Sequence, residues 1–185
     1  MFPALIAFVI CSVHSAASPA AAAETQPGDA VPRPLVLRST TYPAPFVHPR
    51  TVRFGDTDAA KIVYTVKFFD FAMDALDAWF AAVLEHDWYA LNTEFGVSCP
   101  FVQSGLDFKA PLRPGDIVGI EIRIARVGRA SLQFKILGSR CDGERSFEGL
   151  WTCVFVDPAS MKSVPIPAVL ADRIHAYAKA CGPDE

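Results

Sequence analysis

The chain lacks the residue patterns that mark several large classes of protein. It has no block of basic residues, and its net charge is -3 with a pI near 5.8, so the electrostatic footprint of a nucleic-acid-binding protein is missing. Its five cysteines include no C-x-x-C pair and no Cys/His spacing suited to a metal, so we expect no metal site. The absence of a Gly-x-Ser-x-Gly motif argues against a serine hydrolase of the α/β type.

A globular composition is what the chain has instead. It is 185 residues long, 51% hydrophobic and 20% charged, which suits one domain with a proper core and is too short for two large ones. No internal repeat is visible. Cys99 and Cys153 lie inside apolar runs, where an unmodified cysteine behaves as a small hydrophobic residue, so we expect both in the core.

The first 47 residues differ from the rest, and we interpret them as a leader and linker before a single domain at residues 48–181. Residues 2–13 form an apolar run followed by alanines at 20–23, as in the apolar region and cleavage site of a secretory signal. However, no Lys or Arg precedes Arg33, and the run of about 12 residues is too short to span a bilayer. We expect a cytoplasmic protein without a membrane anchor. There are two alternatives: the segment is a working signal and the protein is exported, or the segment is a leader that results from a start codon assigned too far upstream.

One long helix dominates the first half of the expected domain. Residues 48–54 read as a strand ended by Gly55, and apolar residues at spacings of three and four predict a helix from residue 67 to about 87. The apolar stripe of this helix is wide, which is typical of a helix that other elements almost enclose. It comprises Phe68, Phe69, Phe71, Ala72, Ala75, Leu76, Trp79, Phe80, Val83 and Leu84.

Strand patterns replace the helical period after Gly96. We predict strands at residues 97–110, 117–127, 131–139 and 145–156, joined by three tight turns into an antiparallel meander, with a terminal helix at 168–179. The simplest way to bury the long helix is to curl this sheet around it. The sequence therefore predicts an α+β fold in which a curved antiparallel sheet wraps a long central helix.

The turn between the first strand and the long helix carries two acids, Asp56 and Asp58. Such a layout can place a carboxylate beside the amino end of a helix, where developing negative charge is stabilised. Gly-Asp-x-Asp alone is a weak pattern, because Gly and Asp are the commonest turn residues. An alternative interpretation makes both acids turn formers and helix caps.

Residues 53–69 resemble the signature of the 4-hydroxybenzoyl-CoA thioesterase family, whose members cut acyl-CoA thioesters inside a hotdog fold. Residues 108–111 and 114–116 resemble that family's second-strand turn, and residues 155–158 with 161–162 resemble its last-strand ending. The resemblance runs from about residue 48 to 175. It implies an acyl-CoA thioesterase that needs no cofactor.

The same resemblance implies roles for individual residues. Asp58 matches the catalytic acid, acting as nucleophile through a mixed anhydride or as general base on water. The backbone N–H of Thr65, at the start of the long helix, matches the oxyanion donor. Asp56 is expected to brace the turn through local hydrogen bonds.

Four residues depart from the family pattern. Lys61 stands where Gly is usual, Lys67 replaces a small or amide residue, Phe68 replaces Tyr, and Met73 fills a helix position that is often acidic. Phe68 is either a core residue or part of a substrate-binding wall. Because a Phe-rich wall suits a flat, bulky acyl group, we favour an aromatic, benzoyl-type acyl-CoA as substrate.

Two arginines and the sheet edges suggest partners. Arg126 and Arg129 flank a turn and are candidates to bind the phosphates of CoA, or are ordinary solvated turn residues. Open sheet edges predict a homodimer or homotetramer.

Two functions are alternatives to thioester hydrolysis. One is a hotdog protein that binds acyl groups or assembles without hydrolysis. The other is a hotdog dehydratase, although the usual helix His is missing from residues 67–84.

Overall fold

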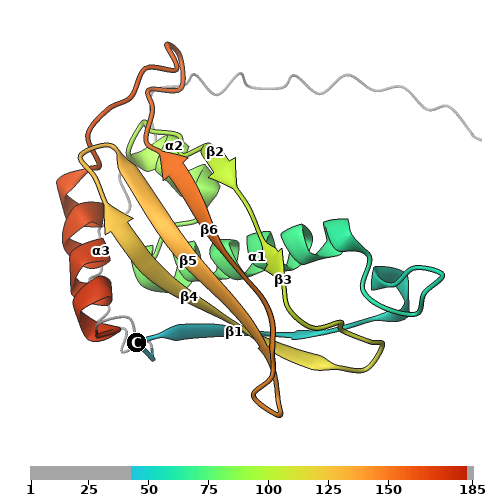
Figure 1. The fold of residues 1–185 in the computed structure, drawn as a ribbon. Coiled ribbons are helices and arrows are strands. Elements are labelled where there is room, and N and C mark those ends of the chain that lie inside the picture. Colours follow the sequence, from blue (N-terminus) through green and yellow to red (C-terminus); the bar gives the residue numbers. More distant parts are fainter. Residues whose placement is uncertain (1–42, 183–185) are drawn as a thin grey trace, which may run out of the picture. The chain divides into compact units, whose positions relative to one another are not determined.

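An antiparallel sheet packed against one long helix forms the centre of the fold (Figure 1). The structure is a computed structural model and describes residues 43–182. Most of the predicted leader therefore lies outside the described residues. The elements are β1 (Phe46–Thr51), η1 (Phe54–Asp56), α1 (Thr65–Trp79), η2 (Phe80–Leu84), α2 (Trp88–Glu94), β2 (Phe101–Ser104), β3 (Asp107–Phe108), β4 (Ile117–Val127), β5 (Ser131–Arg140), β6 (Arg145–Val154) and α3 (Ala168–Ala180).

The six-stranded sheet has the order β1-β4-β5-β6-β2, with β3 also paired to β6. Side chains alternate along β4, where Val118, Ile120 and Ile122 are fully buried and the residues between them are partly exposed. The buried face packs on α1, whose apolar stripe is as wide as the sequence predicts. The α+β architecture with a sheet around a long helix is confirmed.

The prediction of a four-stranded meander was wrong for its first strand. β2 and β3 pair with β6 rather than β4, and the edge position next to β4 belongs to β1. The turn at residues 113–116 does not join two paired strands. Instead, its Gly115 N–H donates to the Val52 carbonyl, and its Asp116 carbonyl accepts a hydrogen bond from Val52 N–H. Residues 109–116 therefore carry the chain from one side of the sheet to the other.

The predicted strand at 97–110 is also two short strands with a kink between them. At the kink the Gly105 carbonyl lies directly over Gly149 of β6, and a Cβ on Gly149 would come within 2.0 Å of that oxygen. This edge of the sheet thus depends on a residue without a side chain at position 149.

The long helix ends earlier than its apolar period predicts. α1 passes into a single π-type turn at η2, and Glu85 follows in the left-handed region at φ 59°. A second helix, α2, then begins at Trp88, and the side chain of its N-cap residue Asp87 accepts a hydrogen bond from Ala90 N–H at 2.8 Å. The periodicity missed this break because the apolar residues of η2 continue the spacing of α1.

The first strand starts two residues before the predicted domain boundary. β1 runs from Phe46 to Thr51 and includes Pro49, which an edge strand tolerates because one side of its backbone makes no ladder bonds. Phe54, predicted as the end of this strand, lies in η1.

The core includes the two cysteines that the sequence predicts to be buried. Cys99 is 7% exposed and Cys153 is fully buried. Their hydrogen bond, together with burial, raises the pKa of the Cys99 thiol far above its usual range. None of the helices within residues 43–182 is long and apolar enough to cross a membrane.

Candidate active site

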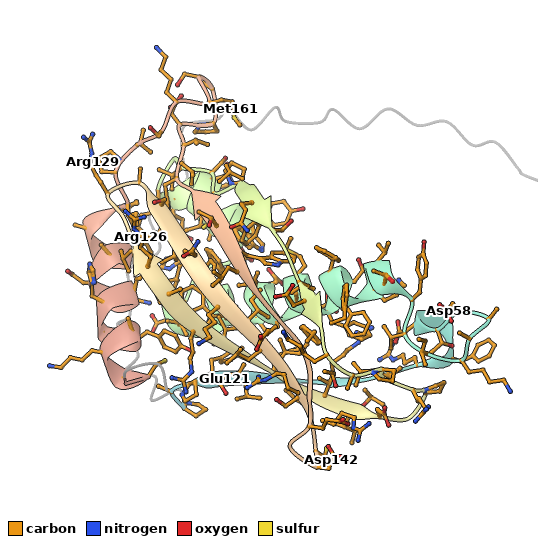
Figure 2. The ribbon with its side chains drawn as sticks, viewed as in Figure 1. Asp58, Glu121, Arg126, Arg129, Asp142 and Met161 are labelled. Atoms are coloured by element: carbon orange, nitrogen blue, oxygen red, sulfur yellow. The ribbon has the colours of Figure 1, made fainter. Side chains whose placement is uncertain are left out.

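Asp58 lies in the turn between η1 and α1, at the end of the molecule where α1 begins (Figure 2). Its Oδ1 accepts a hydrogen bond from Ala60 N–H at 2.8 Å, and its backbone bonds Lys61 and Ile62. The side chain is exposed, and in the part of the chain that the structure describes no partner is recorded for Oδ2. One carboxylate oxygen therefore shapes the turn, while the other makes no hydrogen bond to the described residues.

Asp56 braces the turn, as the sequence predicts. It is only 6% exposed, and its Oδ2 accepts a hydrogen bond from Arg53 N–H at 2.8 Å. Its Oδ1 lies 3.4 Å from the guanidinium of Arg50, and its carbonyl accepts Tyr64 N–H at 2.9 Å. Both the side-chain carboxylate and the backbone carbonyl of Asp56 therefore stabilise the turn.

Thr65 is the first residue of α1, and Tyr64 is its N-cap. The Thr65 N–H precedes the first hydrogen bond of the helix, in which Lys67 N–H donates to the Tyr64 carbonyl at 2.8 Å, so it is a donor available to an anion at this end. Tyr64 supplies no side-chain cap to compete for these donors. The geometry is therefore compatible with the predicted oxyanion role, which stays a prediction.

Lys61 and Lys67, two departures from the family pattern, differ in their surroundings. Lys61 lies at φ 61°, in the left-handed region that favours Gly. Lys67 donates to Asp70 at 2.8 Å, and this hydrogen bond raises the pKa of the lysine. The ammonium of Lys67 is therefore held along the outer side of α1 by its neighbour one turn away.

Phe68 is a core residue in the single chain. It is 5% exposed and lies in an aromatic cluster with Phe108 and Phe147, at ring-centroid distances of 4.9 and 5.4 Å. Phe108 on β3 is 47% exposed, so it forms the accessible side of this cluster. Since Phe68 follows Thr65 by one helical turn, the cluster lies beside the start of α1. The place of Phe108 in this cluster could not be predicted from the sequence, because only the pairing of β3 with β6 brings it beside Phe147.

Arg126 and Arg129 lie at the opposite end of the sheet from Asp58 (Figure 2). Thr51, from which the chain enters the Asp58 turn, pairs with Ile117 at the start of β4. Arg126 is nine residues further along that strand, counting from 117 to 126, which is roughly 30 Å. Within one chain these arginines and Asp58 are therefore separated by about the length of β4.

Other candidate features contribute little to this site. Within residues 43–182 no group of three or more His, Cys, Asp or Glu residues is arranged to hold a metal. A groove of about 660 Å³ lies on the sheet, lined by residues of β2 to β6 that include Lys135, Leu137 and Leu150. None of the predicted site residues lines it, so we do not assign it to the same chemistry.

The fold and the site together define a class of protein. An acidic turn between the first strand and a long helix that an antiparallel sheet enfolds is the arrangement of a hotdog thioesterase. A Thioesterase-like superfamily model matches residues 52–174, and the chain belongs to this family.

Relatives of this chain carry related descriptions. A 1,4-dihydroxy-2-naphthoyl-CoA hydrolase of Gloeothece citriformis is 28% identical over 129 residues, covering 67% of this chain and 87% of that protein. A thioesterase superfamily structure from Jannaschia sp. CCS1 is 36% identical with a TM-score of 0.67, covering 76% of this chain and 97% of the other. A gentisyl-coenzyme A thioesterase structure is 26% identical with a TM-score of 0.60, covering 68% and 98%.

Proposed function

We propose that this chain is a thioester hydrolase that converts an aromatic acyl-CoA to the free acid and CoA. The observation that carries the proposal is that Oδ2 of Asp58 makes no hydrogen bond to the described residues. Its turn is bonded to Tyr64, the residue before α1, through the Asp56 carbonyl. This carboxylate and the Thr65 amide are thereby two fixed groups on either side of one short loop. A thioester carbonyl between them would meet a nucleophile or base on one side and a hydrogen-bond donor on the other.

The chemistry follows from these two groups. As negative charge develops on the thioester oxygen, the Thr65 N–H and the amino end of α1 stabilise it. Asp58 either attacks the carbonyl carbon, expelling the CoA thiolate and leaving a mixed anhydride for water to cleave, or removes a proton from the attacking water. Both routes release CoA and a carboxylic acid, and both require an ionised Asp58.

The preference for an aromatic acyl group rests on Phe108. Its half-exposed ring, supported from behind by Phe68 and Phe147, offers a flat apolar surface beside the start of α1. An aromatic acyl group can stack on such a ring and bury area against it. The naphthoyl-CoA and gentisyl-CoA enzymes among the relatives act on aromatic acyl groups, in keeping with this proposal.

Binding of CoA phosphates requires a second subunit in this account. Because Arg126 and Arg129 lie far from Asp58 in one chain, they can serve the site only if they come from another copy. The β2–β3 edge exposes Val102 and Phe108, and pairing of two such edges would bring one chain's β-sheet next to the other's Asp58 turn. We propose a homodimer as the smallest active unit, with a homotetramer as its extension.

The experiment that tests the proposal is a panel of acyl-CoA thioesters assayed by release of the CoA thiol. Benzoyl-CoA should be hydrolysed with a higher kcat/KM than acetyl-CoA. Equal kcat/KM values for the two substrates would contradict the aromatic preference but not the hydrolase activity. Binding of acyl-CoA without turnover of any member would instead establish the alternative, a non-catalytic acyl-binding protein.

A further inference from the structure

Arg50 of β1 contacts two other elements, η1 and α1, at the Asp58 end of the fold. Its Nη2 lies 3.4 Å from Oδ1 of Asp56, and its Nη1 donates to Oδ2 of Asp74 on α1 at 3.2 Å. Its guanidinium also stacks over the ring of Phe71, with the central carbon 4.6 Å from the ring centroid. One side chain therefore joins the first strand, the turn that carries Asp58, and the long helix.

The contact with Asp56 is the more shielded of the two ion pairs, because the Asp74 side chain is 50% exposed. The Arg50 side chain is 23% exposed, and its partner Asp56 is 9% exposed by the same measure. The planar guanidinium presents several donors in a fixed fork, so two acids and a ring can fix its orientation. A charged pair removed from solvent is held strongly in one arrangement, because separating its members leaves a buried charge without a partner.

Asp56 passes this constraint to both groups of the proposed site. Its second carboxylate oxygen bonds Arg53 N–H, and its carbonyl bonds Tyr64 N–H, immediately before Thr65. Asp58 is two residues further along the same turn. A movement of Asp56 would therefore shift the Asp58 carboxylate and the start of α1 relative to each other.

We propose that Arg50 is a positioning residue, which acts through Asp56 to hold the Asp58 turn against the first residues of α1. The inference rests on the thioesterase activity proposed above. Arg50 itself bonds Asp56 and Asp74, so it has no direct part in the chemistry. Its loss should therefore lower the rate of the chemical step and not the binding of acyl-CoA, since small displacements of reacting groups are costly.

The test measures kcat and KM for benzoyl-CoA, and thermal unfolding, on the full chain and its variants. Arg50→Met should lower kcat by about tenfold or more while KM changes by less than about twofold. Arg50→Lys restores the positive charge without the fork and should recover part of the lost kcat. Asp56→Asn should lower kcat by a similar factor, and the double variant should lose no more than the larger single loss.

A matched control separates positioning from general stability. Arg173 is 16% exposed, pairs with Glu85 at 2.9 Å and donates to the Leu84 carbonyl at 2.7 Å, but it belongs to α3. Arg173→Met should lower Tm as Arg50→Met does and leave kcat unchanged. If both variants lose kcat in proportion to their loss of Tm, the positioning role is overturned.

The other outcomes are also decisive. An unchanged kcat in Arg50→Met, a raised KM instead of a lowered kcat, or losses that simply add in the double variant would overturn the proposal. If Arg50→Met fails to fold, Arg50→Lys decides alone, since a wild-type kcat in that variant would also overturn it. If the wild-type chain is inactive, the proposed function itself is refuted. If the wild type is active and Arg50→Met keeps its kcat, only the role of Arg50 is refuted.

Discussion

Lys61 shows how a single residue can carry a backbone cost next to a candidate catalytic group. It lies at φ 61°, three residues after Asp58, and its N–H bonds the Asp58 carbonyl at 3.0 Å. A side chain in this left-handed region costs roughly 1 kcal/mol relative to Gly, the residue that the resemblance to the thioesterase family implies here. The turn is therefore less stable than a Gly-containing turn of the same shape.

Replacing Lys61 by Gly should stabilise the protein. We expect Lys61→Gly to raise the free energy of unfolding by roughly 0.5–1 kcal/mol, measured by urea denaturation, because the left-handed conformation becomes unstrained. Lys61→Ala is the control, since it removes the charge and keeps the Cβ, and it should give no such gain. Equal gains in both variants would attribute the effect to the ammonium group and contradict the backbone explanation.

Local residue roles could be predicted from the sequence, and long-range ones could not. Asp56 and Asp58 were identifiable because the Gly-Asp-x-Asp turn stands directly before a helical period, and the predicted bracing by Asp56 is confirmed. The catalytic role of Asp58 and the oxyanion role of Thr65 stay predictions. Arg50 was not identifiable, because its contact with Asp74 joins residues 24 positions apart and leaves no local pattern.

At the scale of elements, the docking of α3 depends on one buried hydroxyl. Tyr177 is fully buried, donates to the Ile122 carbonyl of β4 and accepts a hydrogen bond from Phe46 N–H at 2.8 Å. Tyr177→Phe should lower the free energy of unfolding by roughly 1–3 kcal/mol, because it leaves buried backbone groups without a partner. Tyr89→Phe is the control, since Tyr89 is 81% exposed, and it should change little.

The same residue predicts a dependence on pH. Burial raises the pKa of Tyr177, so the folded state favours the neutral phenol. The stabilisation is fully present below the ordinary tyrosine pKa of about 10 and is lost as pH rises above that value toward the folded-state pKa. The stability difference between the wild type and Tyr177→Phe should therefore shrink above about pH 10. A constant difference between pH 8 and about pH 11 would contradict this assignment.

The aromatic cluster joins β3, β6 and α1, and it gives the substrate prediction its test. Phe108→Ala should lower the ratio of kcat/KM for benzoyl-CoA to that for acetyl-CoA by about threefold to tenfold, because the stacking surface is lost. Phe108→Leu, which keeps apolar area without a ring, should lie between. A ratio unchanged in both variants would return Phe108 to a purely structural role.

Helices and strands were predicted correctly where the periodicity of apolar residues is strong. Strand pairing was predicted wrongly where the paired strands are far apart in the sequence. The wide stripe of α1 and the alternation of β4 marked these elements correctly, and the helix at α3 is confirmed. The break at η2 was hidden by apolar residues that continue the helical spacing. The pairing of β2 with β6 was missed because neighbouring strands in sequence were assumed to be neighbours in the sheet.

For the whole molecule, the distance between Asp58 and the two arginines predicts an obligate oligomer. Light scattering should show a dimer or tetramer for the full chain, and a variant lacking residues 1–42 should show the same state, because the strands among residues 43–182 form the sheet without them. Arg129→Ala should raise KM for acyl-CoA and leave kcat nearly unchanged. A fully active monomer at nanomolar concentration would contradict a shared site.

The central claim is that the Asp58 carboxylate carries out thioester hydrolysis, and one comparison tests it most directly. Asn at this position keeps an oxygen to accept the Ala60 N–H bond, so Asp58→Asn should fold and melt like the wild type. Its kcat/KM for benzoyl-CoA should fall by far more than tenfold, the factor that corresponds to about 1.4 kcal/mol of transition-state stabilisation. A folded Asp58→Asn variant that retains more than about a tenth of wild-type kcat/KM would contradict the account.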